Sequence, residues 1–128
     1  MTGDSGGTGD GTTILVVEDD EAVRELVRKA LAPLGSRVFV AGSAAEAAAV
    51  AAGTRIDLLL TDVGLPGPSG TELATELCAA QPALRVIYMT GWQEHIALAD
   101  VPDGLLLSKP FDLAELAQVV AGALGKDP

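Results

Sequence analysis

Five residues with reactive side chains stand directly after short apolar runs of this chain. Glu18 and Asp19 follow the first run, Asp62 follows a second, and Thr90 and Lys109 follow two more. Each run has the length and aliphatic composition of a buried β-strand. In an open parallel sheet, ligands bind outside the carboxyl ends of the strands, so we expect these side chains to converge on one crevice. The four runs are 13–17, 56–61, 85–89 and 105–108.

The acidic side chains of this group are suited to hold a divalent cation. Glu18 and Asp19 are adjacent carboxylates that repel each other, and Mg²⁺ binds a few carboxylates together with waters and phosphate oxygens. Asp62 should face Asp19, because their strands are neighbours in the expected sheet. Simpler interpretations stay open: Asp20 caps a helix, Asp62 is a turn residue, and Asp57 is a surface or turn acid.

Thr90 and Lys109 would add a hydroxyl and a cation to this crevice. Thr90 precedes Gly91, which lets a backbone N–H approach closely, and Lys109 precedes Pro110, a type of position often in cis in a tight turn. A loop threonine and a solvated lysine are the alternatives for each residue alone. Together, a carboxylate nucleophile, a Mg²⁺ site, a hydroxyl and a cation are what in-line phosphoryl transfer to an acid requires.

Strand-like and helix-like patterns alternate five times along the chain. This alternation predicts an α/β fold: a flavodoxin-like, doubly wound, five-stranded parallel sheet of order 2-1-3-4-5 with five helices. Capping boxes are expected at Ser43 with Glu46 and at Asp112 with Glu115. The second strand is expected at 37–41, and the helices at 21–34, 43–53, 71–80, 93–99 and 112–124.

Size and charge limit the possible functions. The chain has 128 residues with a net charge of −10, which argues against binding to nucleic acids or anionic membranes.

The chain has one cysteine, Cys78, so an internal disulfide is excluded, and we expect Cys78 to be a small buried hydrophobic residue. Residues 1–12 are expected to form a flexible leader, 13–125 one domain and 126–128 a tail. No signal peptide or membrane-inserted segment is indicated, so we expect a cytoplasmic protein.

Four motifs resemble the receiver domain of two-component response regulators, including the receivers of hybrid histidine kinases. Each motif is weak alone, but four in this order are highly specific. The resemblance covers about residues 13–125. The motifs are Ile14-Leu15-Val16-Val17-Glu18-Asp19-Asp20, Asp62 with Leu65-Pro66-Gly67 and Gly70, Met89-Thr90-Gly91, and Lys109-Pro110-Phe111.

The resemblance implies a role for each site residue. It implies that Asp62 accepts a phosphoryl group, that Asp19 and Asp62 bind Mg²⁺, and that Glu18 binds it through water with the Gly64 carbonyl completing the site. It implies that Lys109 contacts the phosphoryl group. Thr90 is then implied to be the hydroxyl that responds to phosphorylation.

The resemblance also implies partners and a way of working. The donor would be a histidine kinase or a histidine phosphotransfer protein, and a downstream protein would bind the switched surface of a monomer or a phosphorylation-dependent dimer. The chain would not be an enzyme apart from its own phosphotransfer and self-dephosphorylation. We expect this self-dephosphorylation to be slow, because Gly64 offers no group to orient water and Trp92 could shield the acyl phosphate. It departs from the family at Leu106, where an aromatic residue is often found.

Two other functions remain open from the sequence. A small Mg²⁺-dependent phosphohydrolase would also use a strand-end aspartate as nucleophile, but such enzymes need a second acid two residues on, where this chain has Gly64. A receiver-like scaffold used only for docking is the other alternative. The full set of Asp19, Asp62, Thr90 and Lys109 argues against that scaffold.

Overall fold

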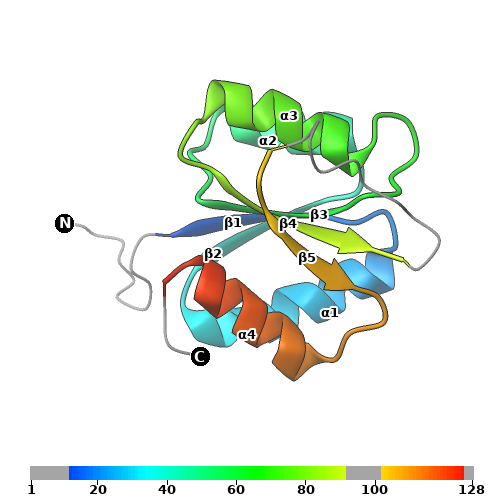
Figure 1. Cartoon of the computed structure of the whole chain (residues 1–128), viewed down its shortest axis with the longest axis vertical. Coiled ribbons are helices and arrows are strands. Elements are labelled where there is room, and N and C mark those ends of the chain that lie inside the picture. The colour runs from blue at the N-terminus through cyan, green and yellow to red at the C-terminus, as the bar shows by residue number, and fades with distance from the viewer. Residues whose placement is uncertain (1–11, 92–101, 126–128) are drawn as a thin grey trace.

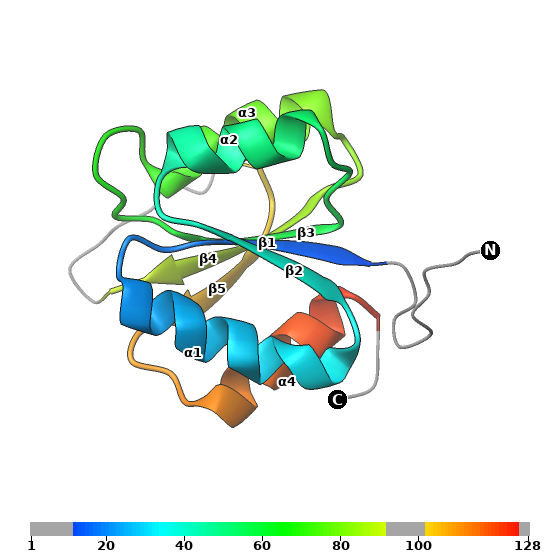
Figure 2. The ribbon, with the colours of Figure 1, turned by 180° about the vertical axis from the view of Figure 1, so that it is seen from behind.

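The protein has three layers, in which helices cover both faces of one parallel sheet. The computed structural model describes residues 12–91 and 102–125. Helices α2 and α3 cover one face of the sheet, and α1 and α4 cover the other (Figures 1 and 2). In chain order the elements are β1 (Thr13–Val17), α1 (Glu21–Leu31), the 3₁₀ turn η2 (Ala32–Leu34), β2 (Arg37–Ala41), α2 (Ala44–Ala52), β3 (Leu58–Asp62), α3 (Gly70–Ala80), β4 (Arg85–Thr90), β5 (Leu105–Ser108) and α4 (Leu113–Ala123).

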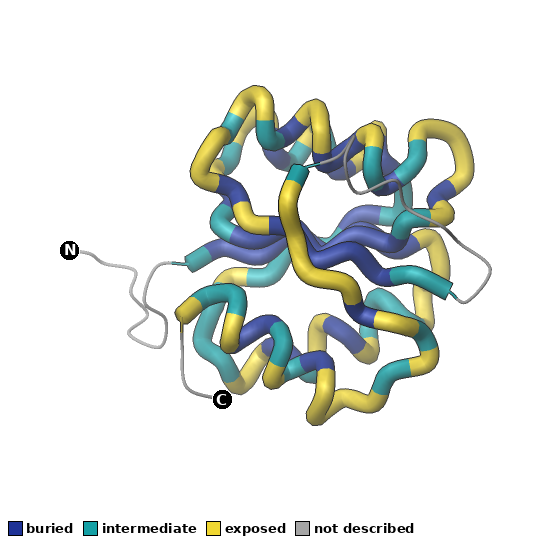
Figure 3. The backbone as a smooth tube through the Cα atoms, viewed as in Figure 1, coloured by how far each residue is buried: buried dark blue, intermediate teal, exposed yellow. Residues whose placement is uncertain are grey.

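The five strands are parallel and lie in the order β2-β1-β3-β4-β5, which confirms the predicted flavodoxin-like sheet. Strands β1 and β3 are at its centre and every one of their residues is buried, as their continuous apolar composition predicted. The edge strand β5 is mostly exposed (Figure 3). On it, the side chain of Leu106 is 49% exposed.

Side chains of the sheet alternate between two separate hydrophobic clusters. Leu15, Leu59 and Tyr88 pack toward α2 and α3, whereas Ile14 and Leu60 pack toward α1 and α4. This alternation is the two-residue period of a β-strand, whose successive side chains point to opposite faces. The sheet therefore separates two cores, and both contain mostly aliphatic side chains.

Several ends of elements differ from the prediction. Helix α1 ends at Leu31 and not at residue 34, because Pro33 cannot donate a helical hydrogen bond and the chain continues as the 3₁₀ turn η2. Strand β3 begins at Leu58 and not at residue 56, since the Ile56 N–H donates to the side chain of Gln81 over 2.8 Å. Helix α3 begins at Gly70, one residue earlier than predicted.

The helix caps were predicted only in part. Ser43 and Asp112 do accept the backbone N–H three residues on, but neither forms a reciprocal capping box. The Glu46 carboxylate instead accepts the N–H of Gly42. A complete capping box, which was not predicted, joins Ser69 and Glu72 at the start of α3.

Residues 12–91 and 102–125 contain four α-helices; the helix predicted at 93–99 lies outside these described residues. Within the same residues, no helix is long and apolar enough to cross a membrane. Cys78 is a free thiol, partly buried against the cluster beneath α2 and α3.

The first turn of α3 lies directly against the end of β3. The Gly70 N–H donates to the Val63 carbonyl over 3.1 Å, and a Cβ atom placed on Gly70 would lie 2.0 Å from the Asp62 carbonyl oxygen. No side chain fits in that space, because both sides of the contact are backbone. Gly70 therefore lets α3 begin beside the strand end that carries Asp62.

We expect Gly70→Ala to destabilise the fold by roughly 1–3 kcal/mol, because α3 or the end of β3 must move to admit the methyl group. Gly122→Ala is the matched control: Gly122 lies in α4 with no atom within 4 Å of its Cβ position. That control should gain about 0.5–1 kcal/mol from its helical backbone. Urea denaturation of both variants measures the difference, and equal stability of the two would contradict the close contact.

Candidate functional site

The pairing of the strands brings the predicted site residues to one edge of the sheet. Glu18 directly follows β1, Asp62 is the last residue of β3 and Thr90 is the last residue of β4. Lys109 directly follows β5, and its N–H donates to the Thr90 carbonyl over 2.8 Å. The parallel register thus places four chain segments side by side at their carboxyl ends, as the sequence predicted.

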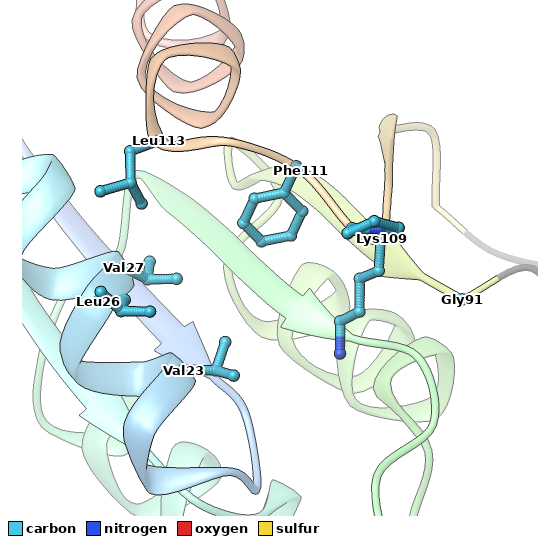
Figure 4. A pocket seen from close by; sticks show the side chains of 8 residues that line it. Val23, Leu26, Val27, Gly91, Lys109, Phe111 and Leu113 are labelled. Atoms are coloured by element: carbon cyan, nitrogen blue, oxygen red, sulfur yellow. The ribbon is translucent and has the colours of Figure 1, made fainter.

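A single lysine joins the two buried acids of this edge. Lys109 Nζ lies 3.1 Å from Glu18 Oε1 and 3.0 Å from Asp62 Oδ2. The Glu18 and Asp62 residues are only 2% and 5% exposed. Figure 4 shows the lysine side chain extending from the turn after β5 toward the strand ends. The peptide bond between Lys109 and Pro110 is cis.

Burial and hydrogen bonding set the protonation of this group. Burial raises the pKa of Glu18, although the N–H of Asp20 and the ammonium of Lys109 partly oppose that rise by bonding to its carboxylate. Burial also disfavours the charge on Lys109, but its hydrogen bonds to Asp62 and Glu18 prevail and its pKa is raised. Lys109 is therefore a stable cation between two acids.

A third acid completes a cluster that fits a hard divalent cation. Oxygen atoms of Glu18, Asp19 and Asp62 lie within 4.8 Å of one another, with Asp19 exposed and the other two buried. Three carboxylates against one ammonium leave an excess of negative charge, which Mg²⁺ would offset. Asp19 is the exposed member of the cluster, and Mg²⁺ typically binds through a few carboxylates while it keeps several waters.

Gly64 and Thr90 lie at the same edge of the sheet, with fewer contacts to the acids and the lysine. The Gly64 N–H donates to Asp62 Oδ1 over 3.2 Å, a contact that the sequence did not indicate, and Gly64 itself is exposed. Thr90 is half-buried, and among the described residues its hydroxyl makes no hydrogen bond to the acids or to Lys109. The structure thus brings together Glu18, Asp19, Asp62 and Lys109, with Thr90 beside them.

An apolar cavity of about 440 Å³ opens beside the acids, between α1 and the start of α4 (Figure 4). Val23 and Leu26 of α1 face Phe111 and Leu113 across it, and Lys109 lies at its edge. Two of these side chains are well exposed: Leu26 and Leu113 are 52% and 45% exposed.

Comparison with known proteins identifies the family. The family described as the response regulator receiver domain matches residues 14–121. The DNA-binding transcriptional regulator NtrC of Azospirillum brasilense is 37% identical over 118 residues, or 90% of this chain. The response regulator receiver protein CpdR of Brucella abortus is 35% identical over 111 residues, which cover 84% of this chain and 92% of that relative.

Solved structures agree with this assignment. A response regulator receiver domain protein (CheY-like) from Methanospirillum hungatei has a TM-score of 0.82 at 26% identity, over 91% of this chain and 95% of that chain. The chain belongs to the response regulator receiver domain family. It spans 24% of the length of NtrC, so its match to that relative concerns one part of a longer protein.

We expect Lys109→Met to lower the free energy of unfolding by about 1–3 kcal/mol near neutral pH without Mg²⁺, because two buried carboxylates lose their cation. This loss of stability is smaller than that expected for breaking a fully buried ion pair, since the lysine side chain is 31% exposed. The loss should shrink at about pH 4, because the raised pKa of Glu18 lets that acid take up a proton as the pH falls.

Urea denaturation at the two pH values measures this effect. Lys29→Met, at an exposed position of α1, is the control and should change stability little at either pH. The wild type should also lose stability at alkaline pH, because the raised pKa of Lys109 means that the unfolded chain releases that proton first. A Lys109→Met cost that is equal at both pH values would contradict the charge argument.

Proposed function

We propose that this chain is a phospho-accepting receiver in two-component or phosphorelay signalling, with Asp62 as the phosphorylation site. The observation that carries the proposal is the Lys109 ammonium bonded to both Asp62 and Glu18, with an Asp19 oxygen in the same cluster. In this role the chain is a switch and not an enzyme, apart from its own phosphotransfer and dephosphorylation. We place it in the cytoplasm.

The chemistry assigned to the chain is transfer of a phosphoryl group from a phosphohistidine to Asp62. A carboxylate oxygen of Asp62 attacks phosphorus, the bond from phosphorus to the histidine nitrogen breaks, and the donor imidazole leaves with that electron pair. Lys109 is placed to hold a phosphoryl oxygen by a charge-assisted hydrogen bond, and Thr90 to offer its hydroxyl to another. When bound by Glu18, Asp19, Asp62 and the Gly64 carbonyl, Mg²⁺ would neutralise charge on the transferring group.

The partners follow from this chemistry. The donor is a histidine kinase or a histidine phosphotransfer protein, and the phosphorylated form binds a downstream protein as a monomer or as a dimer. Phosphorylation shifts the population between two states of the surface near Thr90. Leu106 is an exposed aliphatic residue where the family often has an aromatic one, so this switch works without an aromatic side chain at that position.

Self-dephosphorylation should be slow. Gly64 is exposed and has no side chain to orient an attacking water beside Asp62. We expect Gly64→Gln, which adds an amide there, to shorten the lifetime of the phosphorylated chain, measured by the decay of its mass signal. A wild-type lifetime of seconds would contradict the expectation.

Intact mass spectrometry after incubation with Mg²⁺ and acetyl phosphate tests the proposed function. The wild type should gain one phosphoryl group, and Asp62→Asn should gain none, because an amide oxygen is a poor nucleophile. Asp57→Asn is the matched control: Asp57 lies at the opposite end of the same chain segment, where it accepts the Thr13 N–H over 2.7 Å. It should still gain the group.

The outcomes separate the proposed functions. No mass gain in the wild type, with donor and Mg²⁺ in excess, would favour the docking scaffold. Rapid multiple turnover of a phosphate monoester would favour the phosphohydrolase. A gain that survives in Asp62→Asn would place the phosphorylation site elsewhere.

A further inference from the structure

The guanidinium of Arg24 lies against the main chain of the acidic turn that follows β1. Arg24 Nη1 donates to the Glu18 carbonyl oxygen over 2.8 Å, from six residues along the chain in α1. Among residues 12–91 and 102–125, Arg24 forms no ion pair with a carboxylate, although the chain carries a net charge of −10. We infer that Arg24 is a positioning residue that fixes the acids to which the proposed function assigns Mg²⁺, and the inference rests on that function.

The hydrogen bond from Arg24 holds the peptide group between Glu18 and Asp19, and the plane of this peptide sets the direction in which Asp19 points. The Glu18 carbonyl and the Asp19 N–H belong to one planar unit, so holding the carbonyl fixes that plane. Other bonds tie the neighbouring groups: the Glu18 N–H donates to the Ala41 carbonyl over 3.0 Å, and the Asp20 N–H donates to Glu18 Oε2 over 3.1 Å. Asp19 is exposed, so its backbone and not packing around its side chain places its carboxylate.

The turn between β2 and α2 leaves space for this guanidinium. A Cβ atom on Gly42 would lie 2.9 Å from Arg24 Nη1 and 3.4 Å from Glu46 Oε1. The glycines of the described residues that adopt a positive φ are Gly35, Gly67 and Gly125, so the backbone at Gly42 does not itself require glycine. The absence of a side chain at position 42 therefore leaves space for the Arg24 guanidinium. This is a second observation that supports the observed position of Arg24.

Mg²⁺ affinity is the property that this role predicts. Loss of a residue that hydrogen-bonds to metal ligands, without binding the metal itself, typically weakens metal binding by about 10–100-fold. We therefore expect Arg24→Gln to bind Mg²⁺ about tenfold more weakly than the wild type, by isothermal titration calorimetry on the full chain. Arg24→Lys should recover part of the loss, because an ammonium can still donate to the carbonyl.

Arg28→Gln is the matched control. Arg28 lies one turn further along α1, where it pairs with Glu25 over 2.6 Å on an exposed surface. Its removal should leave Mg²⁺ affinity unchanged. Thermal unfolding of the same samples without Mg²⁺ records how much of each variant is folded, so that a loss of metal binding is not confused with a loss of structure.

Gly42→Ala tests the same contact from its other side. The added methyl group should displace the guanidinium and weaken Mg²⁺ binding in the wild-type background. It should have a smaller effect in the Arg24→Gln background, because the group that it displaces is already gone. Equal effects in both backgrounds would overturn the coupling of Gly42 to Arg24.

The results distinguish this inference from the proposed function. If the wild type binds Mg²⁺ and Arg24→Gln binds it equally well, only the inference fails. If Arg24→Gln loses binding only in proportion to its loss of folded protein, the arginine is structural and the inference also fails. If the wild type does not bind Mg²⁺ at all, both the proposed function and the inference fail.

Discussion

Two buried carboxylates can lie side by side in this protein because one ammonium bonds to both. Removing Glu18 and Asp62 from water is costly, and the cost is larger for two like charges. Lys109 offsets it with hydrogen bonds of 3.1 and 3.0 Å. The balance is incomplete, since Asp19 adds a third negative charge to the cluster. This excess of negative charge is what a bound divalent cation would offset.

The sheet supplies the distances that this charge cluster needs. Neighbouring parallel strands β1 and β3 place the Glu18 turn beside Asp62, and the bond from the Lys109 N–H to the Thr90 carbonyl fixes the turn after β5. Gly70 then allows α3 to begin against the Asp62 carbonyl. Three backbone features thus hold the segments that carry the acids and the lysine: the pairing of β1 with β3, the bond to the Thr90 carbonyl and the close contact at Gly70. A preorganised site requires rigid support of this kind.

Sequence reasoning predicted the sheet order and the residues that meet at its edge. Both follow from short-range patterns, because apolar runs mark the strands and topology brings their carboxyl ends together. Contacts that depend on side-chain direction were not predictable in this way. The bond of Glu46 to Gly42 in place of a capping box, the bond of Gln81 to Ile56, and the bond of Arg24 to Glu18 are of this kind. Gln81 and Ile56 meet because of how the elements pack, whereas the other two pairs are close in the sequence and depend on which way one side chain turns.

The division of the interior into two cores has a consequence for divergence. The cluster under α2 and α3 and the cluster under α1 and α4 share no residue, because the sheet lies between them. Substitutions on one side can accumulate without repacking the other. Leu26 and Leu113, which are half-exposed beside the cavity between α1 and α4, lie on one side of the sheet only, so a substitution there need not disturb the packing under α2 and α3. Such an architecture lets the packing on each face of the sheet diverge independently of the other face.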